Sequence, residues 1–210
     1  MNWHREIMPA EQADLLRTLG PVADRYGYYL AGGTAVGLYL GHRQSIDFDW
    51  FSPDPATRPP EVREALHQAG IALDVKSAGE KLVDGFIGAI RVTFILYPYP
   101  LLEPPIRWDE FGCPIASLRD LVCMKLWAVA NRGSRKDFID IYALLSSGVL
   151  LTEALQHYRR KFGVQDVMPV LYGLTYFDDA EKQPMPNVLI QEGWGRMKSA
   201  IQGWTRGALT

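Results

Sequence analysis

The stretch Tyr28-Tyr29-Leu30-Ala31-Gly32-Gly33-Thr34, followed a little later by Asp47-Phe48-Asp49, indicates how this chain folds. Tyr28 to Ala31 is apolar enough for a strand, and the two glycines permit a tight turn after it. Thr34 to Leu40 predicts a short helix whose N-terminal amides suit a phosphate. Ser45 to Phe51 alternates with period two, which predicts a second strand.

In this second strand the alternation sorts polar and apolar side chains onto opposite faces. Asp47 and Asp49 project to one face, and Ile46, Phe48 and Trp50 project to the other. Two neighbouring carboxylates repel each other unless a cation lies between them, and Mg²⁺ or Mn²⁺ prefers such oxygen ligands. We therefore predict Asp47 and Asp49 as metal ligands in a site for metal-assisted phosphoryl or nucleotidyl transfer.

The residues around the turn are candidates for nucleotide binding. Gly32, Gly33 and Thr34 would hold the phosphates, and Ser45 strengthens the pattern. Arg43 ends the short helix, where it either reaches a phosphate with two hydrogen bonds or caps the helix C-terminus. A lone Gly-Gly is usually only a turn, and a lone Asp-x-Asp is usually solvated. Their order along one strand–turn–helix–strand segment favours the functional interpretation.

Composition limits the class of protein. The chain has 210 residues, of which 48% are hydrophobic and 22% charged, which is ordinary for a globular protein. A net charge of −2 excludes a global field that would attract nucleic acid, so any basic surface is local. The apolar runs are too short for a membrane span, and the first residues lack the apolar core of a signal peptide. Cys113 and Cys123 are predicted to be reduced packing thiols, and we expect a cytoplasmic protein.

The order of elements predicts an α+β fold. A helix is expected over residues 10–26, with a possible break at Gly20-Pro21, and another helix ends near Gly70. Three strand candidates follow, Ile71 to Ser77, Lys81 to Phe86, and Ala89 to Tyr97. From Ser117 onward the chain is expected to be helical. We therefore predict a sheet domain over residues 1–110 and a helical region packed against it over residues 111–210.

The helical half contains a second group of ionisable residues. Ser117 begins a capping-box pattern, so a helix is expected to start there and end near Arg132. Lys125 falls on the apolar stripe of this helix. Its ammonium either extends along the apolar surface to solvent or points into a cleft toward anions.

A second capping box predicts the next helix. Ser134 begins the pattern and the helix is expected to end near Ser146. Asp137 and Asp140 are one turn apart and lie on one side of it. Acids in a first turn often only complement the helix dipole, but Asp140 stands among apolar neighbours, so an unpaired carboxylate there would be costly. Its candidate partners are a metal, Lys125 or Arg43.

Together these residues resemble the AbiEii/AbiGii toxin family of nucleotidyltransferase-like proteins. The opening motif is the more specific part, and the block around Asp137 adds independent support. The matching segments are Tyr29 to Ala35, Gly41 to Ser52, Tyr97 to Pro100, and Lys125 through Arg132 to Asp140.

The resemblance implies a polymerase-β-like nucleotidyltransferase fold and the role of toxin in a toxin–antitoxin or phage-defence pair. It implies transfer of a nucleoside monophosphate from a nucleoside triphosphate to an acceptor hydroxyl, with RNA or tRNA as acceptor and an antitoxin protein as partner. Asp47 and Asp49 would hold Mg²⁺ or Mn²⁺. Lys125 would match the family's lysine, and Asp137 or Asp140 its late acidic residue.

One departure from the pattern leaves alternatives open. Many nucleotidyltransferases carry a third carboxylate on a later strand, and residues 91–96 contain none. Either Asp137 or Asp140 completes the site, or metal binding is weak, or the protein no longer catalyses transfer. We expect one of these two carboxylates within reach of Asp47 and Asp49. The alternative functions are nucleotidylation of a small molecule such as an antibiotic, and a non-catalytic nucleotide- or partner-binding module.

Overall fold

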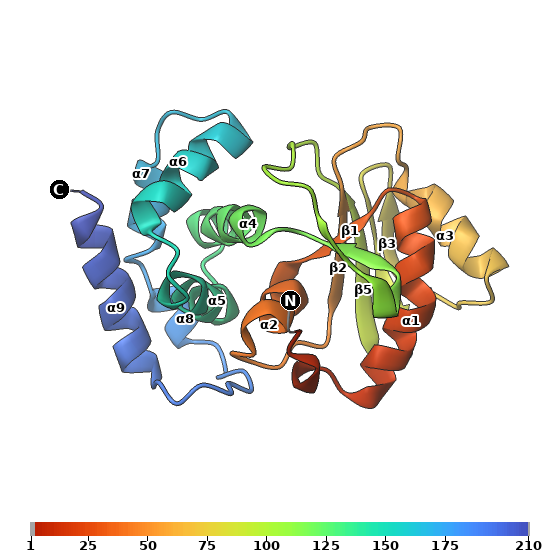
Figure 1. Cartoon of the computed structure of the whole chain (residues 1–210), viewed down its shortest axis with the longest axis horizontal. Coiled ribbons are helices and arrows are strands. Elements are labelled where there is room, and N and C mark those ends of the chain that lie inside the picture. Colours follow the sequence, from red (N-terminus) through yellow and green to blue (C-terminus); the bar gives the residue numbers. More distant parts are fainter. Residues whose placement is uncertain (1–2, 210) are drawn as a thin grey trace. The chain divides into compact units, whose positions relative to one another are not determined.

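The computed structural model describes residues 3–209, which form two compact units (Figure 1). We call residues 5–35 and 45–117 the sheet unit. The helical unit comprises residues 36–44 and 118–209 together with residues 3 and 4. Helix α2 (Gly32–Leu40) runs from one unit into the other, since its first turn belongs to the sheet unit and the rest to the helical unit.

Within the described residues, the sheet unit holds one mixed sheet of seven strands in the order β3-β4-β5-β2-β1-β7-β6. β2 runs parallel to β5 and β1 runs parallel to β7, while the other neighbours are antiparallel. This confirms the predicted α+β class. The strands are β1 (Tyr29–Ala31), β2 (Phe48–Ser52), β3 (Asp74–Gly79), β4 (Leu82–Ile87), β5 (Ile90–Leu96), β6 (Ile106–Trp108) and β7 (Cys113–Ile115).

The two faces of the sheet differ in chemistry. Trp50, Phe94 and Val83 occupy neighbouring positions on β2, β5 and β4, are fully buried, and form an apolar row. Trp50 stacks on Phe94 with ring centroids 6.3 Å apart, and Tyr28 meets Phe94 edge-on at 5.1 Å. Burial, and secondarily the charge of Glu61, raise the pKa of Tyr28.

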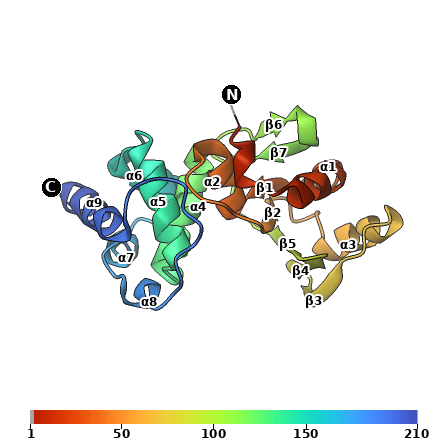
Figure 2. The same cartoon turned by 90° about the horizontal axis from the view of Figure 1, so that it is seen from below.

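Helices α1 (Ala10–Arg25) and α3 (Pro59–Gln68) cover this apolar face, and Figure 2 shows both on the same side of the sheet. Two short 3₁₀ helices, Arg5–Ile7 and Asp109–Phe111, complete the unit. The helix expected over residues 10–26 is continuous in spite of Pro21. At Gly20 a Cβ would collide with the backbone oxygen of Phe111, so the missing side chain lets α1 pack closely there.

Two of the strands were not predicted from the sequence. β6 and β7 are short, and β7 lies in the region 111–210 that was expected to be helical. Along the chain the boundary between the two units falls between residues 117 and 118, and residues 36–44 belong to the helical unit. The physical reason is that Cys113–Ile115 pairs with distant Leu30 and with β6, and such pairings leave no periodic signal in a short segment.

The helical unit is built around α4 (Leu118–Asn131). α4 packs against the three helices α5, α6 and α7, and α5 in turn contacts α8 and α9. Inside this packing Lys161 Nζ lies 2.6 Å from Asp120 Oδ1, and both side chains are fully buried. The remaining helices are α5 (Arg135–Ser146), α6 (Leu151–Phe162), α7 (Met168–Gly173), α8 (Asp178–Glu181) and α9 (Trp194–Gly207).

Among the described residues no single helix is long and apolar enough to cross a membrane. Only α5 and α6 taken together reach that length and apolarity, and the chain bends by 117° between them. Cys113 and Cys123 are free and buried, and burial raises the pKa of each thiol to about 12. This confirms their interpretation as reduced packing thiols.

Candidate functional site

The two strands of the predicted strand–turn–helix–strand segment, β1 and β2, are neighbours in the middle of the sheet. β1 pairs antiparallel with β2, so that Ala31 lies beside Asp49. Gly32 follows with φ +68°, and a Cβ there would collide with the Asp49 carboxylate. The glycine is therefore required twice, for its backbone conformation and for the space that the carboxylate occupies.

The turn is fastened to the strand that follows it. The Thr34 hydroxyl donates a hydrogen bond to the backbone oxygen of Asp47, and Thr34 is buried. Asp47 and Asp49 are half-buried, whereas Phe48 and Trp50 between and beside them are fully buried. The predicted alternation is thus present, although Ile46, expected on the apolar face, precedes the strand and is 51% exposed.

Asp49 continues into a polar row across the sheet. Thr93 on β5 lies beside Asp49, and Asp84 on β4 lies beside Thr93. The Thr93 hydroxyl donates to Asp84 Oδ1 at 3.1 Å. The position next to Asp49 on β5 is therefore a threonine, and the nearest acid in the row belongs to β4.

Arg91 lies at the end of the same row. Its Nε donates to Asp84 Oδ1 at 2.8 Å, and its side chain is 51% exposed while that of Asp84 is 15% exposed. The hydrogen bond to Asp84 raises the pKa of Arg91, burial opposes this, and the charges of Asp84, Asp49 and Asp47 reinforce it. A guanidinium is thus fixed beside the acidic pair.

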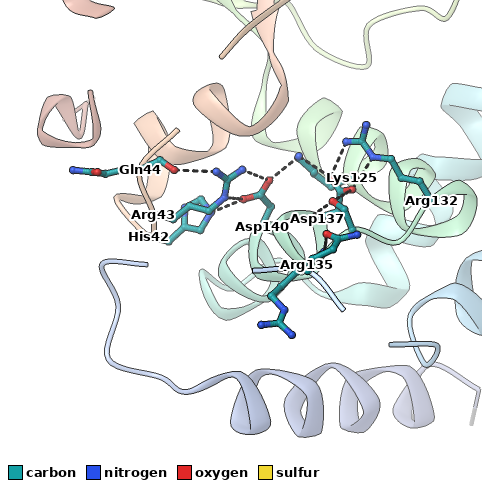
Figure 3. A network of polar contacts seen from close by, with 10 residues as sticks. His42, Arg43, Gln44, Lys125, Arg132, Arg135, Asp137 and Asp140 are labelled. Atoms are coloured by element: carbon teal, nitrogen blue, oxygen red, sulfur yellow. Dashed lines mark hydrogen bonds and ion pairs between the residues drawn. The ribbon is translucent and has the colours of Figure 1, made fainter. Parts of the chain in front are cut away.

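The helical unit contains a second, buried group of charges, shown in Figure 3. We call His42, Arg43, Lys125, Arg132, Asp137 and Asp140 the ion cluster. Asp140 is at its centre and is fully buried. Arg43 donates two hydrogen bonds to the Asp140 carboxylate, from Nε at 2.6 Å and from Nη2 at 2.9 Å. Lys125 Nζ lies 2.6 Å from Asp140 Oδ2. His42 Nε2 lies 2.7 Å from Asp140 Oδ1.

Asp137 extends the cluster toward solvent. Lys125 Nζ lies 3.0 Å from its Oδ1, and Arg132 Nε donates to its Oδ2 at 2.8 Å. Ser134 caps the helix as predicted, because its hydroxyl accepts from the Asp137 backbone nitrogen at 3.4 Å and donates to the Asp137 carboxylate at 2.6 Å. Three basic side chains therefore surround two carboxylates.

These contacts hold the cluster in its ionised form. Burial by itself would raise the pKa of Asp140, but the charges of Arg43 and Lys125 hold it well below the usual range. Burial opposes ionisation of Asp137 in the same way, and Lys125 and Arg132 lower its pKa. Burial would lower the pKa of Lys125, and the charges of Asp140 and Asp137 raise it above its ordinary value.

Segment 42–44 is fixed to the helical unit through backbone pairing as well. Arg43 forms an antiparallel bridge with Val188, and the nitrogen of Gln44 donates to the oxygen of Asn187 at 2.9 Å. Arg43 is 2% exposed, so any phosphate would compete with Asp140 for its guanidinium. Its predicted role in nucleotide binding stays a prediction, as does that of half-buried Ser45.

The predicted site residues thus gather in two groups. Gly32, Gly33, Thr34, Asp47 and Asp49 lie together in the sheet unit, and the carboxylates are its candidate metal ligands. Arg43, Lys125, Asp137 and Asp140 lie together in the helical unit. Lys125 does not extend to solvent, since its side chain is 7% exposed and its ammonium contacts the carboxylates of Asp137 and Asp140. The catalytic roles predicted for Lys125, Asp137 and Asp140 stay predictions. So does the completion of the metal site by Asp137 or Asp140.

Sequence reasoning missed several polar residues. Arg91, Thr93 and Asp84 join the acidic pair only through strand register, which a single sequence does not display. His42 and Arg132 join the ion cluster without any motif of their own. The available signal for Asp84 was a charged residue within an otherwise apolar strand.

Comparison with known proteins identifies a family and a relative that match most of the chain. The family described as "Nucleotidyl transferase AbiEii toxin, Type IV TA system" matches residues 14–204. An uncharacterised protein of Aquifex aeolicus strain VF5 is 32% identical over 175 residues, which cover 82% of this chain and 84% of that protein.

Two solved structures share the fold. The nucleotidyltransferase toxin MenT4 of Mycobacterium tuberculosis H37Rv has a TM-score of 0.59 and 14% identity, covering 95% of this chain and 85% of MenT4. A protein from H. pylori described as a putative nucleotidyltransferase has a TM-score of 0.55 and 13% identity, covering 94% and 93% of the two chains. The expected nucleotidyltransferase fold is therefore confirmed.

Proposed function

This chain belongs to the nucleotidyltransferase AbiEii toxin family, and we propose that it transfers a nucleoside monophosphate from a nucleoside triphosphate to a hydroxyl of an RNA acceptor such as tRNA. The observation that carries this proposal is the junction of β1, α2 and β2. There a glycine turn with a positive φ stands directly against the Asp49 carboxylate. Such a junction offers backbone amides to phosphates and carboxylates to a cation within one small site.

The donor set suits a divalent metal. Asp47 and Asp49 offer hard oxygen ligands, and Mg²⁺ commonly takes one or two protein carboxylates together with substrate phosphates. Among the described residues no group of three or more His, Cys, Asp or Glu side chains is arranged around one point, so the triphosphate would supply the remaining ligands. When bound at these two residues, the ion would supply positive charge that stabilises the phosphates of the transition state.

The chemical step is an in-line displacement. A bond forms between the acceptor hydroxyl oxygen and the α-phosphorus, and the bond from the α-phosphorus to the oxygen that bridges to the β-phosphorus breaks. Pyrophosphate leaves with the electron pair, and the hydroxyl proton passes to solvent water. Gly32 and Gly33 hold the phosphates through backbone amides, and the Thr34 hydrogen bond to Asp47 keeps the turn and the acidic strand in register.

The experiment is incubation with each labelled nucleoside triphosphate, Mg²⁺ or Mn²⁺, and a mixed RNA pool. We expect label in RNA and release of pyrophosphate, and we expect both to be lost in Asp47→Asn and Asp49→Asn. Asp74→Asn is the matched control, because Asp74 is an exposed aspartate of the same unit that pairs with Lys76. Label in a small hydroxyl compound would support the antibiotic alternative. Triphosphate binding without transfer to any acceptor would support the binding module.

The family description also implies an antitoxin partner. Since both proposed substrates are abundant in the cytoplasm, we place the activity there. Co-expression with the protein encoded beside this chain would test the partner, because a true antitoxin should restore growth that the wild type arrests. Asp49→Asn should arrest no growth in the first place.

A further inference from the structure

We propose that Arg91 binds a backbone phosphate of the RNA acceptor, and that Asp84 and Thr93 hold it in position for this. The inference rests on the proposed transfer reaction and extends it to acceptor recognition. In the sheet, β2 with the acidic pair lies between β1 and β5.

The order of strands separates two sides of the reaction. The glycine turn that would hold the triphosphate follows β1, on one side of β2. Arg91 belongs to β5, on the opposite side of β2. In an in-line displacement the attacking oxygen and the leaving pyrophosphate stand on opposite sides of the α-phosphorus. With pyrophosphate held at the β1 side, the acceptor approaches from the side of β5.

Arg91 is placed and oriented for such an acceptor. The register pair Phe48–Val92 puts Arg91 next to the position of Asp47. Its Nε donates to Asp84 Oδ1, and its half-exposed side chain makes no other hydrogen bond or ion pair with a described residue, which leaves the two terminal nitrogens available to a ligand. A guanidinium held at Nε presents two parallel N–H groups, which match two oxygens of a phosphate.

The environment explains why an arginine would stand here. Asp47 and Asp49 repel an RNA strand, which carries one negative charge per nucleotide. A metal ion bound at these two residues would not neutralise the RNA backbone phosphates next to the acceptor hydroxyl. A fixed cation on the acceptor side lowers this repulsion where the acceptor end must come close. Asp84 keeps Arg91 from folding back onto the acidic pair, and the Thr93 hydroxyl in turn fixes Asp84.

The test measures binding of bulk tRNA and of a nucleoside triphosphate separately. Arg91→Gln should weaken tRNA binding by about ten- to a hundredfold and leave triphosphate binding in calorimetry unchanged. It should also reduce the slope of log affinity against log salt by about 0.7 to 1, as expected for one lost phosphate contact. Arg107→Gln is the matched control, because Arg107 is also a half-exposed arginine paired with an aspartate, on edge strand β6.

Two variants of Asp84 separate positioning from general folding effects. Asp84→Ala should weaken tRNA binding by a smaller factor with the salt slope of the wild type, because the arginine charge is still present. Asp84→Asn should restore most of the affinity, since its amide oxygen accepts the Arg91 Nε bond. Unchanged tRNA affinity and salt slope in Arg91→Gln, no tRNA binding by the wild type, or an effect confined to the triphosphate would each overturn the proposal. If instead the proposed transfer reaction is wrong, Asp47→Asn should bind the triphosphate as well as the wild type does.

Discussion

Two pairs of aspartates, one in each unit, look alike in sequence but differ in what surrounds them. Asp137 and Asp140 are buried and are contacted by Arg43, Lys125 and Arg132. Asp47 and Asp49 are half-buried beside a glycine turn, with Arg91 fixed to the neighbouring Asp84.

This difference in surroundings indicates which carboxylates a ligand can reach. A carboxylate buried with its own cations has already exchanged water for protein partners, and removal of one partner leaves an uncompensated charge. A half-buried pair next to a glycine turn is more accessible to a cation from outside. We therefore expect the larger loss of stability when a charge of the ion cluster is removed, and we propose that Asp47 and Asp49 are the pair that would hold a metal. The following predictions test this contrast.

The largest effect is expected at Asp140. Asp140→Asn leaves two buried cations, Arg43 and Lys125, without their shared carboxylate, and should lower the free energy of unfolding by about 3–5 kcal/mol. Urea unfolding followed by circular dichroism measures this. Asp47→Asn is the control and should change stability by no more than about 1 kcal/mol. Equal stability of the two variants would contradict the contrast.

The next effect is expected at Lys125. Lys125→Met would leave Asp137 and Asp140 with fewer cations. We expect a loss of about 3 kcal/mol in urea unfolding. The loss should be smaller than for Asp140→Asn because Arg43 and Arg132 still hold the two carboxylates. A variant as stable as the wild type that lost only transfer would instead favour a catalytic lysine.

The third effect concerns the reaction rate. Asp47→Asn and Asp49→Asn should each reduce nucleotide transfer by about a hundredfold or more, because each removes charge that acts on the transition state. Their unfolding curves should match the wild type within about 1 kcal/mol. Initial rates at saturating triphosphate measure the loss. Retained transfer in both variants would remove these residues from the metal site.

The smallest effect is a dependence of stability on pH. The pKa values of Asp137 and Asp140 in the folded protein lie below the value of about 3.9 for an unfolded chain. Their contribution is therefore complete above that value and is lost as pH falls through the folded pKa values. Stability should be level down to about pH 4 and then fall by up to about 1.4 kcal/mol per pH unit for each carboxyl. Asp140→Asn should show a shallower fall in unfolding experiments between pH 5 and 2, and an identical slope would contradict the assignment.

Local sequence patterns predicted much of the fold and the part of the candidate site formed by the glycine turn, Asp47 and Asp49. Period-two alternation and the glycine turn located β1, α2 and β2, and the Ser134 capping box located the start of α5. These signals work because neighbouring residues in the chain produce them. Boundaries moved by a few residues, as with the strand expected from Ser45, which begins at Phe48.

The α+β class, the family resemblance and the set of charged residues follow from the amino-acid sequence alone. Which of these charges come into contact depends on the tertiary structure. Arg43 and Asp140 stand 97 residues apart and form two hydrogen bonds, Lys161 reaches Asp120 across 41 residues, and Arg91 joins the acidic pair through strand register. The reason is that an ionisable side chain costs free energy when it is buried alone, so its role depends on partners that packing brings to it from distant parts of the chain.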